Sequence, residues 1–156
     1  MTITVNVELG YEFDVKASAK EVFDLLSNVP ESASHYPQVE ALTDLGGGTY
    51  RWTMEKIGIA SIHLQTVYVS RYVANRAKGS VIWTPVAGEG NTLVSGSWKI
   101  TAGKKSTNVV LHVNGDIALP LPALMKLVAQ PLVEAEFEKL TEKYIDNLTQ
   151  CFGGEI

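Results

Sequence analysis

The chain has 156 residues, of which 46% are apolar and 19% charged, so it has the length of one ordinary domain and a globular composition. Its formal net charge is −4, and lysine and arginine are scattered along it, so we expect no nucleic-acid partner. Cys151 is the only cysteine, which excludes an internal disulfide and a metal site built from several thiolates. A single cysteine is typical of proteins in a reducing compartment, so we expect a cytoplasmic protein.

The sequence predicts neither export nor a membrane span. The first six residues alternate in polarity and lack the basic and apolar regions of a signal peptide. The most apolar stretch, from Ile117 to Val133, is interrupted by prolines and a lysine and falls short of the ~20 apolar residues that cross a bilayer. We therefore expect this stretch to belong to the fold or, at most, to a membrane surface.

The first elements in chain order are a long strand and a short helix. Apolar residues occupy the odd positions of residues 3–15, which is the period of a half-buried strand. Ser18 and Glu21 form a capping box in front of apolar residues at helical spacing. This pattern predicts a helix over residues 18–28.

A second short helix and a series of strands follow. Pro30 permits a helical turn and Pro37 stops it, which predicts a helix over residues 29–36. Strand-like runs then alternate with turn residues, and their connections are too short for parallel crossovers, so we predict antiparallel pairing. One run changes the parity of its apolar residues, which predicts a bulge near Gln65 or Thr66. The predicted runs are 39–45, 49–56, 59–73, 77–85, 93–101 and 107–119, which makes seven strands with the first included.

The last predicted element is a long helix. Pro131 suits the first position of a helix, and an apolar stripe at helical spacing follows it up to Phe152. The opposite face is charged, as expected for a solvated surface. A helix of this length spans ~30 Å. We therefore predict one helix from Pro131 to Phe152 that lies across the whole sheet.

This order of elements is similar to that of the START-like helix-grip superfamily (SRPBCC), which includes the Bet v 1 allergens and the polyketide cyclase/dehydrase-like proteins. Residues 18–26 (SAKEVFDLL) resemble the opening helix of that superfamily. Residues 35–37 (HYP) and 48–52 (GTYRW) resemble its aromatic-proline turn and its G-x-Y-x-W strand. The closing run over residues 119–148 also resembles the CoxG-type branch, which is associated with carbon monoxide dehydrogenase maturation.

The resemblance implies an α+β helix-grip fold, in which a seven-stranded curved antiparallel sheet wraps around a long C-terminal helix, with two short helices between strands 1 and 2. It implies one START-like ligand-binding domain over residues 1–156. It also implies a cavity between sheet and helix, which members use for lipids, sterols, polyketides or similar apolar ligands. The candidate ligand-binding residues are Tyr36, Tyr50, Trp52, Met54, Trp98, Ile100, Val113, Ile117, Leu124, Met125, Phe137, Leu140 and Tyr144.

Few polar groups are candidates for this cavity. We take His35, His63 and Arg71 as candidate polar contacts. The histidines lack the spacing of a metal site, so we predict neither a metal nor another cofactor. Cys151 has no basic partner nearby in sequence, and Ser95-Gly96-Ser97 is not a nucleophile elbow, so we assign no catalytic residue.

Three functions stay open at this point. The leading hypothesis is binding or transport of an apolar small molecule. The second is an enzyme of the cyclase or dehydratase type, in which a histidine or tyrosine inside the cavity moves protons. The third is a CoxG-like maturation or assembly factor that docks on a protein or a membrane surface through the segment from Leu119 to Val133. Plain core packing also explains each apolar candidate, and residue parity does not separate core from cavity wall.

Overall fold

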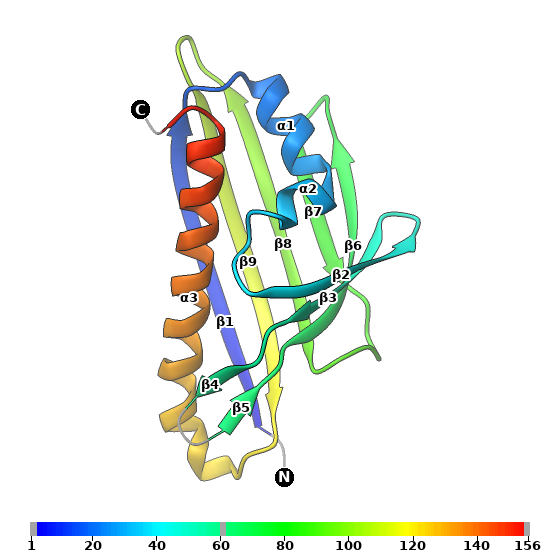
Figure 1. Ribbon diagram of the computed structural model, residues 1–156, viewed down its shortest axis with the longest axis vertical. Helices are drawn as coiled ribbons and strands as arrows, with labels where there is room; N and C mark the ends of the chain where they lie inside the picture. The colour runs from blue at the N-terminus through cyan, green and yellow to red at the C-terminus, as the bar shows by residue number, and fades with distance from the viewer. Residues whose placement is uncertain (1–2, 60–61, 155–156) are drawn as a thin grey trace.

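A seven-stranded antiparallel sheet curls around a long helix in the computed structural model of the protein (Figure 1). The structure describes residues 3–59 and 62–154, the side chains of residues 57–59 and 62–64 excepted. The elements in chain order are β1 (Ile3–Val15), α1 (Ala19–Ser27), α2 (Val29–Ala33), β2 (Val39–Gly46), β3 (Thr49–Met54), β4 (Ile57–Ile59), β5 (Ile62–Leu64), β6 (Val67–Asn75), β7 (Ser80–Pro85), β8 (Thr92–Ala102), β9 (Thr107–Leu119), η1 (Ala123–Met125) and α3 (Lys126–Cys151).

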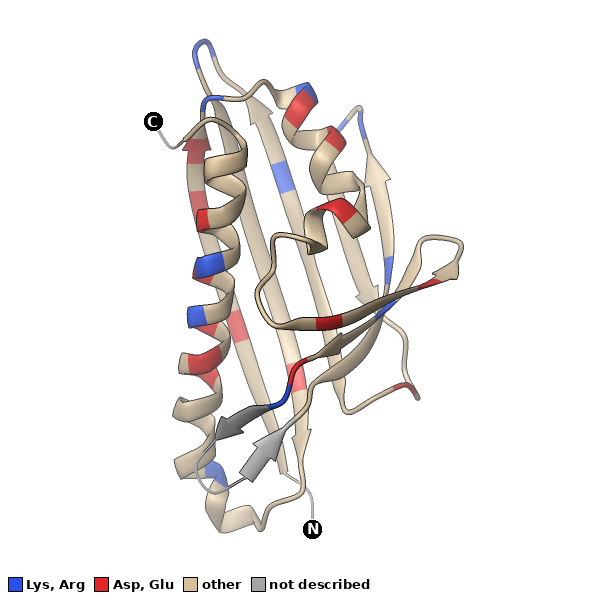
Figure 2. Cartoon of the chain, in the orientation of Figure 1, with Lys and Arg blue, Asp and Glu red and all other residues tan. Residues whose placement is uncertain are grey.

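The sheet has the strand order β1-β9-β8-β7-β6-β3-β2. Its longest pair, β1 with β9, keeps one register from Ile3 opposite Leu119 to Val15 opposite Thr107. In Figure 1, α3 runs lengthwise beside β1, while α1 and α2 lie in front of β7 and β8. The outward side of α3 carries acidic residues and lysines (Figure 2), as predicted for a solvated face. The predicted seven-stranded antiparallel sheet and the helix-grip fold are confirmed.

The two short helices form where their end signals lie. Ser18 caps the N-terminus of α1 with its side chain, as the capping box predicts, and Asn28 does the same for α2. The second helix is shorter than predicted, since α2 ends at Ala33 and not at Tyr36. After Ala33 the N–H groups of His35 and Tyr36 bond to carbonyls three residues back, so the chain continues as tighter turns up to Pro37.

The single strand predicted over residues 59–73 is wrong. β5 ends at Leu64 and β6 begins at Val67, and β4 and β5 pair with each other as a separate two-stranded sheet. The Asn91 side chain occupies the break, because its Oδ1 accepts from the Val67 N–H at 3.0 Å and its Nδ2 donates to the Gln65 carbonyl at 2.8 Å. A side chain thus makes the hydrogen bonds of a neighbouring strand where a bulge was predicted.

The C-terminal helix begins earlier than predicted. It starts at Lys126, directly after η1, and Pro131 lies inside it. Pro131 has no N–H for the carbonyl of Leu127, but Leu127 is 88% exposed, so water can take that bond. Among the described residues, no helix is long and apolar enough to cross a membrane.

The buried apolar residues form three clusters. The first lies between α1, the C-terminal half of α3 and strands β7 to β9; the second joins the start of β1, the end of β9 and the start of α3. The third joins α2 to β3. Tyr36 and Tyr72 pack against both the first and the third cluster. The space left between these clusters contains the cavities described below.

Gly96→Ala is expected to destabilise the fold, because Gly96 packs directly against the Trp83 ring. A Cβ at this position would clash with the His112 carbonyl oxygen and would lie 2.5 and 2.6 Å from two ring carbons of Trp83. Overpacking of this kind costs about 1–3 kcal/mol. The matched control in urea unfolding is Gly115→Ala, whose added Cβ has its nearest neighbours at 3.9 Å. Equal free energies of unfolding for the two variants would contradict this packing.

Candidate functional site

The larger of two interior cavities is lined mainly by aromatic side chains. We name it the aromatic cavity, and its volume is about 80 Å³. The chain has three tryptophans, and all of them belong to this lining. The fluorescence of the protein therefore reports on this cavity. The lining residues are Leu26, Val29, Ser32, Tyr36, Trp52, Tyr68, Tyr72, Trp83, Val94, Trp98, Leu111, Val113, Thr141 and Tyr144.

A closed circuit of contacts joins six aromatic residues in this wall. Five of the contacts are between rings, with centroids 4.9 to 6.5 Å apart. The sixth is a hydrogen bond of 3.0 Å from the Trp52 indole N–H to the Tyr72 hydroxyl. Aromatic pairs at such distances stabilise by about 0.5–1.5 kcal/mol each beyond burial. The circuit runs through Tyr36, Trp52, Tyr72, Trp83, Trp98 and Tyr144 and returns to Tyr36.

Strand register brings these rings together. Trp83 on β7 lies opposite Tyr72 on β6 and opposite Gly96 on β8. Because Gly96 has no side chain, the Trp83 ring lies over its Cα. Trp52 on β3 lies opposite Tyr68 on β6, and the two rings are stacked with centroids 5.7 Å apart. Residues on four strands thus form one continuous aromatic surface on the inner face of the sheet.

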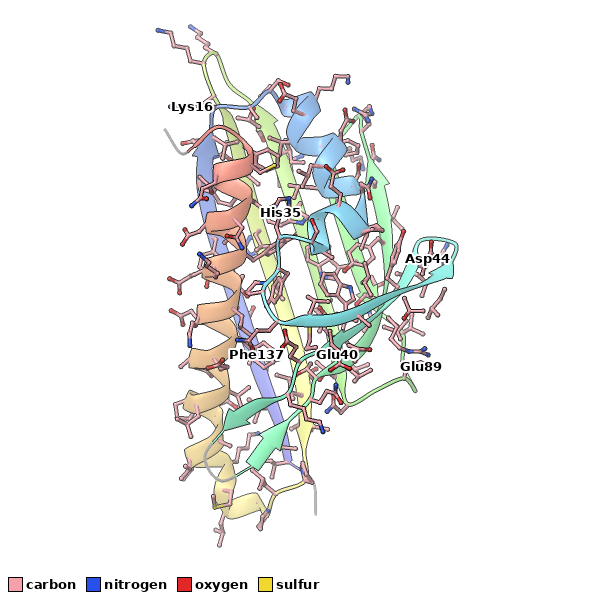
Figure 3. The ribbon with its side chains drawn as sticks, viewed as in Figure 1. Lys16, His35, Glu40, Asp44, Glu89 and Phe137 are labelled. Carbon is pink, nitrogen blue, oxygen red and sulfur yellow. The ribbon has the colours of Figure 1, made fainter. Side chains whose placement is uncertain are left out.

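The second cavity, which we name the apolar cavity, lies next to the first and has a volume of about 60 Å³. Phe137 projects into it from α3 (Figure 3). The two cavities are separated by a thin wall, since five residues line both: Tyr36, Tyr68, Val94, Val113 and Thr141. The other lining residues are Val7, Leu9, Met54, Thr66, Thr92, Gly115, Ile117 and Phe137.

Hydroxyl groups supply the polar part of the aromatic cavity. The Tyr144 hydroxyl forms a buried hydrogen bond with Ser32 Oγ. The Tyr36 hydroxyl lies 3.3 Å from Thr141 Oγ1. Both bonds connect α3 to α2 or to the residues that follow it, so they hold these elements together across the cavity.

Burial keeps the tyrosines neutral. It raises the pKa of Tyr36 from 10.0 to about 12, although the hydrogen bond with Thr141 acts in the opposite direction. Burial also raises the pKa values of Tyr68, Tyr72 and Tyr144. At neutral pH these phenols are therefore protonated. They donate and accept hydrogen bonds but do not take up a proton as a general base.

Charged groups lie elsewhere. No carboxylate, histidine, lysine or arginine side chain in the described part of the chain lines either cavity. Within the same residues, no three histidine, cysteine, aspartate or glutamate side chains are grouped as metal ligands. The described interior therefore offers ring contacts and neutral hydrogen bonds to a bound molecule.

The structure brings most of the predicted ligand-binding residues to these two cavities. Tyr36, Trp52, Trp98, Val113 and Tyr144 line the aromatic cavity. Tyr36 and Val113 also line the apolar cavity, together with Met54, Ile117 and Phe137.

Three further candidates lie outside the two cavities. Ile100 and Leu140 are buried in the core. Tyr50 lies in a surface groove between α2 and β2. We name this the outer groove; its lining is Pro30, Ala33, Ser34, Tyr36, Val39, Glu40, Ala41, Leu42, Asp44 and Tyr50.

Leu124 and Met125 form no cavity mouth. η1 lies beyond the start of α3 at the end of the molecule (Figure 1), and Leu124 is 90% exposed there. Leu127, Val128 and Leu132 on the first turns of α3 are exposed as well. The segment from Leu119 to Val133 therefore presents apolar side chains away from both cavities.

The candidate polar contacts are not brought together. His35 is half-buried and lines neither cavity, and its carbonyl accepts a hydrogen bond from Asn147 Nδ2 at 2.8 Å. Arg71 is exposed on β6. The His63 side chain lies outside the described residues.

Several lining residues were missed in the sequence. Three of them, Tyr68, Tyr72 and Trp83, are aromatic residues in predicted strands, and this was the available signal. Parity did not separate them, because Val69 and Ser70 are both buried and the exposed Ile82 beside Trp83 is apolar. Nothing in the local sequence distinguishes the polar lining residues, Ser32 and Thr141, from other serines and threonines. The missed residues include Ser32, Tyr68, Tyr72, Trp83, Val94 and Thr141.

Comparison with known families agrees with this arrangement. The family model described as polyketide cyclase/dehydrase and lipid transport matches residues 6–149. The chain belongs to this family. No curated protein sequence matches this polyketide cyclase/dehydrase family member significantly.

Solved structures share its fold at low sequence identity. A START superfamily protein from Mycobacterium smegmatis has a TM-score of 0.68 at 15% identity, over 94% of this chain and 97% of that one. The Zhui aromatase/cyclase from Streptomyces sp. R1128 has a TM-score of 0.68 at 16% identity, over 93% and 92%. Norcoclaurine synthase from Thalictrum flavum has a TM-score of 0.64 at 16% identity, over 96% of each chain. These similarities show the START-like helix-grip fold.

Tyr144→Phe is expected to destabilise the protein by about 1–3 kcal/mol, because it leaves the buried Ser32 hydroxyl without its partner. Adding Ser32→Ala to this variant removes the orphaned group and should recover part of the loss. Urea unfolding of the two single variants and the double variant gives the coupling free energy. Strictly additive effects would mean that the hydrogen bond contributes nothing.

The stability of the protein should fall at alkaline pH. The Tyr36 pKa is raised from 10.0 to about 12, so this group contributes stability below pH 10 that is lost as the pH rises to 12. Tyr36→Phe removes one of the ionising groups and should make the decline shallower. Urea unfolding across this pH window tests the effect, with Tyr50→Phe as the control outside both cavities. Identical slopes for wild type and Tyr36→Phe would contradict it.

Proposed function

We propose that the protein binds a small, neutral, mainly apolar ring compound in the aromatic cavity and the apolar cavity next to it. The observation that carries the proposal is the closed circuit of aromatic side chains, which bears neutral hydroxyls. Such a wall offers ring faces and edges for contact and a few hydrogen bonds for orientation, as small-molecule sites generally do.

Volume favours a ligand of about one ring. The cavities measure about 80 and 60 Å³. Sites for drug-sized ligands measure roughly 300–1,000 Å³, and an apolar cavity of about 150 Å³ holds benzene. A lipid, a sterol or a complete polyketide therefore needs a large rearrangement, whereas a single ring needs a small one. Norcoclaurine synthase, which shares the fold, was solved with dopamine and hydroxybenzaldehyde, and these are one-ring compounds.

Electrostatics favours a neutral ligand. A charged group would lose its water in this interior and would find no charged side chain among the described lining residues. A carbonyl or hydroxyl oxygen, in contrast, matches the tyrosine hydroxyls as hydrogen-bond partners.

A cyclase or dehydratase activity in the same cavities is the second candidate. It is supported by the family and by the place of Tyr36 and Tyr144 in the cavity wall. Their raised pKa values suit them to hold a carbonyl oxygen by donation and make them poor bases near neutral pH. His35 lines neither cavity. Binding without chemistry is therefore the leading proposal.

Docking through the segment from Leu119 to Val133 stays a separate prediction. It rests on the exposed side chains of Leu124, Leu127, Val128 and Leu132. Because these side chains lie away from the cavities, charged substitutions there should leave ligand affinity unchanged.

Phenol titration tests the proposed function. We expect a saturable change in tryptophan fluorescence, matched by a heat signal in calorimetry, because all three tryptophans line the aromatic cavity. Val113→Phe fills the wall shared by both cavities and should weaken binding about tenfold or more. Val73→Phe on the exposed face of β6 is the matched control and should bind like wild type.

Two results together would contradict the proposed binding function. One is the absence of saturable binding of phenol, benzaldehyde and indole by either method. The other is native mass spectrometry that finds no co-purified small molecule. If Val113→Phe and Val73→Phe weaken binding equally, the ligand binds outside the two cavities.

A further inference from the structure

One side chain, Tyr36, borders three separate spaces. It lines the aromatic cavity, the apolar cavity and the outer groove, and no other side chain in the described part of the chain lines all three. The first two spaces lie between the sheet and the helices and are partly open, and the third is more open to solvent. The Tyr36 ring is therefore a wall that both cavities share with the outer groove.

The backbone on both sides of Tyr36 is fixed. Asn147 Nδ2 donates to the His35 carbonyl at 2.8 Å, which ties the preceding residue to α3. The Glu55 N–H donates to the Gln38 carbonyl at 2.7 Å, which ties the following segment to the end of β3. These bonds restrain the backbone next to Tyr36, so side-chain rotation is the smallest movement that could change the wall.

Among the described residues, the Tyr36 hydroxyl has one hydrogen-bond partner, and that bond is long. The hydroxyl lies 3.3 Å from Thr141 Oγ1, whereas hydroxyl pairs usually lie about 2.5–3.0 Å apart. The Tyr36 ring contacts Tyr144 and Trp52 with centroids 4.9 and 6.1 Å away. Rotation of the side chain would therefore break two ring contacts and one long hydrogen bond, and no other hydrogen bond of the hydroxyl to the described residues opposes it.

The outer groove has room for the displaced ring. Its volume is about 320 Å³, which exceeds that of either cavity. Apolar side chains of α2 and β2, such as Ala33, Val39 and Leu42, line it. A rotation of Tyr36 into this groove would keep its ring against apolar groups. The same rotation would remove one of the five side chains that line both cavities and would widen the connection between the cavities and the groove.

We propose that Tyr36 is the specificity-determining residue of the site, which admits the ligand by side-chain rotation and sets its upper size. This inference rests on the proposed binding function. With Tyr36 in place, the two cavities accept one-ring compounds. Without its ring, they form one chamber that accepts two or three fused rings.

The test compares three probes of increasing size: phenol, 2-naphthol and 1-aminoanthracene. Wild type should bind them with affinity that falls in this order. Tyr36→Ala should reverse the order, with the affinity for 1-aminoanthracene raised about tenfold or more. Tyr11→Ala is the matched control, because Tyr11 is a half-buried tyrosine that packs against the first core cluster and lines none of the three spaces.

Tyr36→Phe and Thr141→Val keep the proposal testable if Tyr36→Ala does not fold. Both variants remove the hydrogen bond that holds the ring and keep the volume of the wall. Stopped-flow fluorescence should show faster association of phenol with both, while the order of affinities among the three probes stays that of wild type. Association rates equal to those of wild type would overturn the role of Tyr36 as a gate.

The affinities for the three probes distinguish a failure of this inference from a failure of the proposed binding function. If all proteins bind the probes and Tyr36→Ala keeps the wild-type order, the size-setting role of Tyr36 is wrong and the binding function stands. A reversal shared by Tyr11→Ala would also overturn the role of Tyr36. If neither wild type nor any variant binds any probe, the binding function itself is wrong, and so is the gating role of Tyr36.

Discussion

Contacts between aromatic rings join the elements of this fold around its interior. The circuit takes one ring from the α2–β2 connection, one from α3 and one each from β3, β6, β7 and β8. A sheet curved around a single helix encloses more space than that helix fills, and large rings fill most of the remainder. The two cavities are the space that these rings leave unfilled. The same contacts therefore stabilise the fold and shape the site, so a change to one ring affects both.

The polar groups of this interior follow from the same constraint. A buried charge without a partner is costly, whereas a phenol can be buried if its hydroxyl finds one hydrogen bond. Tyr144 bonds to Ser32, and Tyr36 lies within reach of Thr141. Burial then keeps the phenols protonated. The described lining of both cavities therefore combines aromatic rings with neutral hydroxyl groups.

Local patterns predicted most helices and strands because their signals lie in neighbouring residues, whereas the curvature of the sheet around the long helix was implied by the family resemblance. Period two over β1 and the Ser18 cap of α1 depend on neighbours in sequence, and both were right. The site was predicted only in part, because it depends on register. Trp83 belongs to the aromatic wall through its place opposite Tyr72 and Gly96, and the pairing register that puts them opposite one another is not visible in the local pattern of any one strand. Nothing near Ser32 or Thr141 marks them as partners of tyrosines on other elements.

Asn91 shows how one distant side chain sets the limits of the site. It replaces a strand partner at Gln65 and Val67, so the main sheet ends there and the chain leaves it as the β4–β5 hairpin, which contacts α3. Thr66, held in that break, and Thr92, whose hydroxyl donates to Asn91 Oδ1 at 3.0 Å, both line the apolar cavity. A loop residue that touches neither cavity thus fixes the wall of one of them. The strand break that sequence parity misread as a bulge is therefore a structural part of the site.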